Sequence, residues 1–318
     1  SKSHPMNLAI SKAAITALCL AMLTTCGQED FGKAETAGIR TAIRPTADVG
    51  INGTLPAGPL NETSFPAATE GVFAVTAYRT DKVHFDNQPV NTAADGSLSF
   101  AVPQYYPANG DKLRFYAYSP TVGSDNYTAG TETDGPTVRW QLDGLQDLLW
   151  SAVTDAIGQA GQGEEQVQPQ FKFRHLLKQV RFKLVQGEGF DRFTNAQKIS
   201  ITNCHPEASL NLVTGELSVT GEPTTAISIS GSYAIQPDQT ASVISKSLLC
   251  EVGETETQLD IAVEVGNVTF KTSVTLPGGA GLSHLITLVF NATHIKPQAS
   301  IVDWDTVGEV EGDITTQS

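Results

Sequence analysis

The residue types that most often carry chemistry are few and scattered in this chain. Its 318 residues include six histidines and four cysteines, which are Cys19, Cys26, Cys204 and Cys250. No two cysteines form a CxxC pair, and no histidines accompany them at the spacing of zinc ligands. The sequence contains no GxSxG, Walker-type phosphate loop or HExxH motif. It therefore predicts no metal, no cofactor and no enzymatic activity.

The remaining polar candidates fit a structural role better than a catalytic one. His175 lies on the apolar face of a predicted strand, so we expect a core histidine that is hydrogen-bonded to the backbone. Asp303 and Asp305 flank Trp304, where a tryptophan that docks the last strand is favoured over a sugar-stacking site. A hydrolase whose paired carboxylates come from distant positions is a further alternative, and a cleft with two facing carboxylates would indicate it.

The charge of the chain excludes two classes of partner. The formal net charge is -14, and no run of five or more lysines and arginines occurs. Such a chain repels nucleic acid and anionic lipid headgroups, so we expect neither as a partner.

The two cysteines outside the amino-terminal region lie among predicted strands. An oxidising export compartment would allow Cys204 and Cys250 to form a disulfide. Two buried free thiols fit the sequence equally well.

The amino-terminal residues read as an export signal. Residues 13–23 form an apolar run that is too short for a membrane span and typical of a signal peptide. The run ends in Leu-Thr-Thr-Cys, which resembles a lipobox whose cysteine, Cys26, receives lipid and becomes the mature amino terminus. An ordinary signal peptide with an incidental Cys26 is the alternative.

Composition divides the rest of the chain. After a signal peptide of residues 1–25, residues 26–66 are rich in Gly, Pro, Thr and Ala and predict a tether with one strand near residues 37–43. The segment GQAGQGEEQVQP has almost no apolar anchor and predicts a linker. We therefore expect a first domain at 67–160, a linker at 161–169 and a second domain with an extended tail at 170–318.

Short alternating runs and turn signals predict an all-β protein. Residues 112–118 (KLRFYAY) place Leu113, Phe115 and Ala117 on one face of a strand. Thr-Gly at 214–215 lies at the centre of a predicted hairpin over residues 210–219. Turn signals every 8–15 residues, without a long helical period, are typical of sandwiches and barrels. The alternation shifts by one residue between 177 and 180, which predicts a bulge or short break.

Several segments resemble, in the same order, motifs of the fimbrillin-like proteins of the Bacteroides group. The segments are residues 105–107 (YYP), 112–120 (KLRFYAYSP), 147–152 (DLLWSA), 171–180 (FKFRHLLKQV), 212–217 (LVTGEL) and 286–304. The acidic stretch Gln-Glu-Asp at 28–30 also resembles a surface-export signal of lipoproteins in that group.

This resemblance implies a fold, a location and partners. The fold would be two tandem transthyretin-like Greek-key β-sandwich domains. The function would be that of a pilus subunit or cell-surface adhesin, held in the outer membrane by its lipid and assembled by donor-strand exchange. The partners would be other pilus subunits, in a homo- or heteropolymer, together with a host protein or glycan.

The resemblance also implies proteolytic removal of an amino-terminal segment. Arg40 and Arg44 stand in the predicted tether, where exposed backbone is open to proteases. Pro45 disfavours cleavage after Arg44, so Arg40 is the favoured site. An uncleaved anchor or accessory subunit is equally expected.

The donor strand would come from the carboxyl-terminal tail, residues 301–318. Ile301, Val307, Val310 and Ile314 are its candidate pocket-filling side chains, although their spacing is irregular for a strand.

A surface glycan-binding lipoprotein is the alternative from another class. It would use exposed aromatic rings, such as those of Trp140, Trp150 or Trp304, against sugar rings. Buried tryptophans would count against it.

Overall fold

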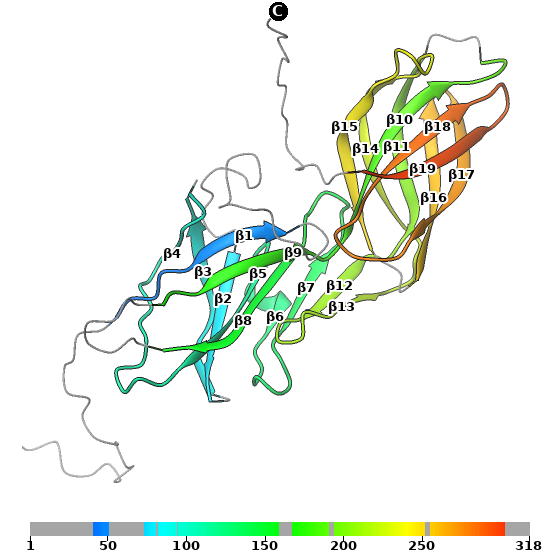
Figure 1. Ribbon diagram of the computed structural model, residues 1–318. Helices are drawn as coiled ribbons and strands as arrows, with labels where there is room; N and C mark the ends of the chain where they lie inside the picture. Colours follow the sequence, from blue (N-terminus) through cyan, green and yellow to red (C-terminus); the bar gives the residue numbers. More distant parts are fainter. Residues whose placement is uncertain are drawn as a thin grey trace, which may run out of the picture. The chain divides into compact units, whose positions relative to one another are not determined.

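The strands of this protein fall into four sheets, so the prediction of an all-β protein is confirmed (Figure 1). The computed structural model describes residues 41–50, 73–80, 82–93, 95–158, 167–190, 194–251 and 255–302. Within these ranges there are 19 strands and one three-residue 3-10 helix. None of the described elements is a helix long and apolar enough to cross a membrane. The signal peptide, Cys26, Arg40, Trp304, Val307, Val310 and Ile314 lie outside the described residues.

The largest sheet has the strand order β1-β9-β8-β5-β2-β3-β4. Strands β1 and β9 are parallel, and the other neighbours are antiparallel. Its strands are β1 (Thr46–Gly50), β2 (Phe73–Arg79), β3 (Lys82–Thr92), β4 (Leu98–Phe100), β5 (Leu113–Ser119), β8 (Leu149–Ile157) and β9 (Gln170–His175).

Two four-stranded sheets, β15-β10-β18-β19 and β14-β11-β16-β17, contain most of the later strands. Strands β10 and β18 are parallel, whereas the other pairs are antiparallel. The strands are β10 (Lys178–Gln186), β11 (Asn195–Cys204), β14 (Thr225–Ala234), β15 (Val243–Cys250), β16 (Glu256–Val265), β17 (Val268–Pro277), β18 (Ser283–Phe290) and β19 (Ile295–Val302). The short break predicted between residues 177 and 180 lies slightly earlier, at residues 176–177, because β9 ends at His175 and β10 begins at Lys178.

A small fourth sheet, β13-β12-β7-β6, joins distant parts of the sequence. Its strands are β6 (Tyr127–Thr128), β7 (Thr137–Gln141), β12 (Glu207–Asn211) and β13 (Leu217–Thr220). The hairpin predicted around Thr214 and Gly215 is confirmed, since β12 and β13 pair with Leu210 opposite Leu217.

Strand pairing crosses the predicted linker at two places. Strand β9 follows the linker but pairs with β1 and β8, which precede it. Strand β12 pairs with β7, with Ala208 opposite Trp140. All described residues belong to one compact unit, Arg40–Ser318. The division into sandwiches at 67–160 and 170–318, and their Greek-key topology, stay predictions.

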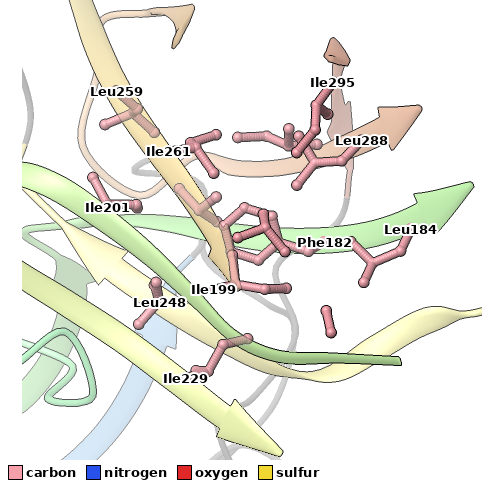
Figure 2. Close-up of a cluster of buried hydrophobic side chains, with 14 of the residues drawn as sticks. Phe182, Leu184, Ile199, Ile201, Ile229, Leu248, Leu259, Ile261, Leu288 and Ile295 are labelled. Carbon is pink, nitrogen blue, oxygen red and sulfur yellow. The ribbon is translucent and has the colours of Figure 1, made fainter. Parts of the chain in front are cut away.

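Both faces of the largest sheet are buried. On β5, Phe115 and Ala117 enter one apolar cluster, and Tyr116 and Tyr118 enter another on the opposite face. This agrees with the predicted alternation of residues 112–118. A third cluster fills the space between the two four-stranded sheets, where Phe182, Ile199, Ile229 and Leu248 are among the labelled side chains (Figure 2).

The buried tyrosines are satisfied by a polar network. Their hydroxyl groups donate hydrogen bonds from Tyr78 to the Gly130 carbonyl (2.8 Å), from Tyr116 to Glu132 Oε1 (2.8 Å) and from Tyr118 to Asn87 Oδ1 (2.7 Å). Burial raises the pKa of Tyr118 to about 12. Because a buried hydroxyl without a partner is costly, this network allows tyrosine to occupy core positions.

Candidate functional site

Residues 41–47 form an extended segment that leads into β1. The side chains of Thr41, Ile43, Pro45 and Ala47 are buried, and those between them are half-buried or exposed. This alternation is that of a strand with one face on a core. Most of the strand predicted near residues 37–43 lies outside the described residues, and the first described strand, β1, is Thr46–Gly50.

One side of this segment is hydrogen-bonded to residues 96–106. Ile43 N donates to the Gln104 carbonyl at 2.8 Å, and Ala47 N donates to the Gly96 carbonyl at 2.9 Å. In the other direction, Leu98 N donates to the Pro45 carbonyl at 2.9 Å. Main-chain bonds of this kind do not depend on the identity of the side chains.

The other side of the segment is bonded to residues 168–174. Thr46 N donates to the Pro169 carbonyl at 3.0 Å, and β1 continues in parallel register along β9 (Figure 1). The side-chain amide of Gln168 extends this pairing, because its Oε1 accepts from Arg44 N at 2.8 Å. The segment thus lies in a slot that is closed on both sides by other strands.

Aromatic side chains form the floor of this slot. Ile43 and Ala47 belong to the buried cluster that also contains Phe73, Phe115 and Phe171. Ile43 is 4% exposed and Ala47 is 3% exposed, so the segment covers this cluster closely. Removal of residues 41–47 would leave a groove with an apolar floor and two rows of unpaired main-chain groups, which is the surface that β-augmentation uses.

Comparison with known proteins identifies the family of a chain with this architecture. The sequence profile of fimbrillin-like proteins matches residues 66–304. The chain belongs to the fimbrillin-like family. Such proteins are structural rather than enzymatic, so the prediction that the chain is not an enzyme is confirmed by its family.

Several solved structures share the fold of this fimbrillin-like protein. A proposed cell adhesion protein from Bacteroides uniformis is 18% identical, with a TM-score of 0.58 over 83% of this chain and 99% of that chain. A second one, from Bacteroides ovatus, is 15% identical, with a TM-score of 0.59 over 84% and 99%. A fimbrial protein from Bacteroides vulgatus is 16% identical, with a TM-score of 0.54 over 83% and 99%. Among curated protein sequences, none is similar enough to count as a relative.

Two of the predicted site residues of this fimbrillin-like protein fall in the described ranges. The Arg44 side chain is exposed, on the outer face of the segment just described. Ile301 is 59% exposed on β19, opposite His284 of β18. Arg44 precedes β1 and Ile301 lies on β19, and these two strands belong to different sheets.

Two of the three tryptophans are engaged within the fold. Trp140 is 5% exposed, and its Nε1 donates to the Pro120 carbonyl at 3.0 Å. Trp150 is half-buried, and the Arg174 guanidinium lies 4.8 Å from its ring centroid. Neither ring is an exposed platform for a sugar, which counts against the glycan-binding alternative at these two positions.

His175 has a partner that sequence reasoning missed. It is buried as predicted, but its Nδ1 lies 2.8 Å from Asp147 Oδ2. Across the ranges that the structure covers, no three His, Cys, Asp or Glu side chains gather closely enough to hold a metal ion. The sequence pattern that could have predicted the 41–47 strand is the alternation of Thr41, Ile43 and Ala47. This pattern is weak because two of the three residues are small or polar.

Proposed function

We propose that this fimbrillin-like protein is a pilus subunit or adhesin of the cell surface. It would be exported as a lipoprotein through Cys26 to the outer membrane and assembled by donor-strand exchange. The observation that carries the proposal is the strand segment at 41–47. It is held by main-chain bonds on both sides and by small or aliphatic side chains below, so another strand can replace it without repacking the core.

The two arginines would have different effects if cleaved. Cleavage after Arg40 leaves all four buried side chains of the segment attached to the protein. Cleavage after Arg44 removes Thr41 and Ile43 but leaves Pro45 and Ala47. No lysine or arginine occurs between Pro45 and Tyr78, so an arginine-specific protease does not release the rest of the slot strand.

We favour cleavage after Arg40. Strand exchange then requires residues 41–47 to leave the slot while they remain covalently attached to the rest of the chain. The incoming strand would be a neighbour's tail, residues 301–318. Its proposed pocket-filling side chains are those of Ile301, Val307, Val310 and Ile314. The competing strand is displaced because a longer donor makes more main-chain bonds than residues 41–47 make.

The test is an assembly assay on the full chain. The purified protein is treated with an arginine-specific protease, and SDS-resistant ladders are recorded on unheated gels. We expect ladders from the wild type, and none from the Arg40→Ala/Arg44→Ala double variant or from a chain that lacks residues 306–318. Arg79→Ala removes an arginine of β2 that pairs with Asp111 at 3.2 Å, and this control should keep its ladder.

The opposite result is equally clear. If the wild type is cut at Arg40 or Arg44 and forms no ladder, or if ladders persist without residues 306–318, this slot and this tail do not exchange strands. A chain that stays uncut and lipid-modified at Cys26 on native cells would be a terminal subunit, which contradicts processing at either arginine.

A further inference from the structure

Two buried cysteines end strands of opposite sheets. Cys204 is the last residue of β11, and Cys250 is the last residue of β15. The two strands belong to the two sheets that enclose the apolar cluster of Figure 2. Each cysteine is 2% exposed, belongs to this cluster and is a free thiol in the structure.

The residues that follow the two cysteines are in direct contact. His205 N donates to Glu251 Oε1 at 3.2 Å and to Oε2 at 3.1 Å. The ring of His205 reaches the same carboxylate, with Nδ1 at 2.7 Å from Oε1. Because His205 directly follows Cys204 and Glu251 directly follows Cys250, this contact joins the ends of the two strands that the cysteines close.

A short loop independently connects the same two strand ends. Leu142 N donates to the carbonyl of Pro206, two residues after Cys204, at 2.8 Å. Leu249 N, one residue before Cys250, donates to the Gly144 carbonyl at 2.7 Å. The loop from Leu142 to Gly144 thus spans the gap between the strand ends and limits its width.

We propose that Cys204 and Cys250 form a disulfide that ties the two sheets together when the chain folds in an oxidising compartment. A disulfide requires Cα atoms about 4.4–6.8 Å apart, so the proposal requires the two strand ends to come within this distance during folding. The two thiols lose two protons and two electrons and form the S–S bond. A protein disulfide of the export compartment accepts the electrons and becomes two thiols. The oxidising environment rests on the surface location proposed above.

Burial decides when the bond forms. It raises the pKa of the Cys204 thiol well above its usual range, and that of Cys250 to about 12. Thiolates, not thiols, carry out disulfide exchange, so the folded protein reacts slowly at neutral pH. The bond therefore forms during folding and then stays closed, as a structural cross-link rather than a reversible switch.

The cross-link lies where the chain passes into the small sheet. Directly after Cys204 the chain continues through His205 and Pro206 into β12, which pairs with β7. A bond at this point closes the loop between residues 204 and 250 and restricts the unfolded chain. We expect it to raise the melting temperature by about 5–10 °C for a chain of this size.

Peptide mapping of the full chain tests the proposal. The protein is produced once by export to an oxidising compartment and once in a reducing cytoplasm. Each sample is denatured in the presence of iodoacetamide, which alkylates free thiols, and is digested with trypsin without reduction. Trypsin places Cys204 in the peptide 199–246 and Cys250 in the peptide 247–271. We expect the two peptides to be linked after export, and to be separate and alkylated after cytoplasmic production. The exported form should melt at the higher temperature.

Alkylation of both peptides in the exported protein would overturn the proposal, as would links from either to Cys19 or Cys26. In the Cys204→Ala variant the 247–271 peptide should be alkylated after export. The Cys204→Ala/Cys250→Ala variant should still form ladders in the assembly assay. A chain with linked peptides but no ladder would contradict strand exchange and leave the disulfide proposal standing. The two proposals can therefore be contradicted independently of each other.

Discussion

At the scale of single residues, strand β18 contains a buried histidine that is costly to protonate. His284 on β18 is 1% exposed, and its Nε2 has no hydrogen-bond partner among the described residues. Lys178 is fully buried nearby, and its Nζ donates to the Pro277 carbonyl. Burial, together with the charge of Lys178, lowers the pKa of His284 to about 4.

This histidine should make stability fall as the pH drops from 6.5 to 4. In that window the unfolded chain binds a proton at His284 and the folded chain does not, which favours unfolding by about 2–3 kcal/mol at pH 4.5. The His284→Leu variant should lose less stability than the wild type between pH 7 and pH 4.5. Urea denaturation at both values measures the difference.

The exposed His294 provides the control, since His294→Leu should leave the pH dependence of the wild type unchanged. If His284→Leu and wild type lose the same free energy of unfolding, the depressed pKa is not present in the folded protein.

Residue types could be predicted from the sequence more readily than their partners. Alternation with phenylalanines was enough to predict that His175 is buried, but not its contact with Asp147, 28 positions away. Cys204 and Cys250 could be identified as a possible pair, whereas the contact of His205 with Glu251 that brings them together depends on how two sheets pack. Such contacts have no periodic signal in a single sequence.

At the scale of elements, the β12–β13 hairpin docks against β8 and β9 through its turn. Gly215 has a φ of +71°, and a Cβ placed there would lie 2.7 Å from the Trp150 ring. Trp150 Nε1 donates to the Leu212 carbonyl at 2.7 Å, and Arg174 Nη2 donates to the Gly215 carbonyl at 2.7 Å. The turn therefore needs glycine both for its conformation and for the close approach of the ring.

Gly215→Ala should destabilise the protein by about 2–4 kcal/mol, from backbone strain and displacement of Trp150. Gly110 is a matched control, because its φ is +81° and nothing lies within 4 Å of its Cβ position. Gly110→Ala should cost only the strain, about 1 kcal/mol. Denaturant midpoints of the two variants make the comparison, and equal losses would mean that the hairpin turn does not dock on Trp150.

Local elements were also more predictable than the pairs that they form. The Thr-Gly turn was sufficient to predict the hairpin, since a two-strand pair with a short turn is set by adjacent residues. The pairing of β12 with β7 and the parallel pairing of β1 with β9 join segments more than 60 residues apart. Alternating patterns show that a strand has a buried face, but they do not name its neighbour.

At the scale of the whole molecule, these distant pairs make the chain before the linker depend on the chain after it. Without β9, strand β8 loses the neighbour that pairs with its first residues, and β1 loses its parallel partner. Without β12, strand β7 keeps only its short pairing with β6, and Trp140 loses the cover of Ala208 and Leu210, which share its buried cluster. Removal of the chain after the linker therefore removes core contacts of the chain before it, so the two parts are not independent units.

We accordingly expect a fragment of residues 41–160 not to fold alone. It should show no cooperative thermal unfolding by circular dichroism and little protection from hydrogen exchange, because its two exposed sheet edges and open apolar face cannot be compensated locally. Co-expression with residues 167–318 supplies β9, β12 and β13 and should restore a folded, co-purifying complex that unfolds in a single transition. The opposite result would be a cooperative transition of the 41–160 fragment by itself, near the melting temperature of the full chain. It would show that the strand pairs formed across the linker contribute little to the stability of this fragment.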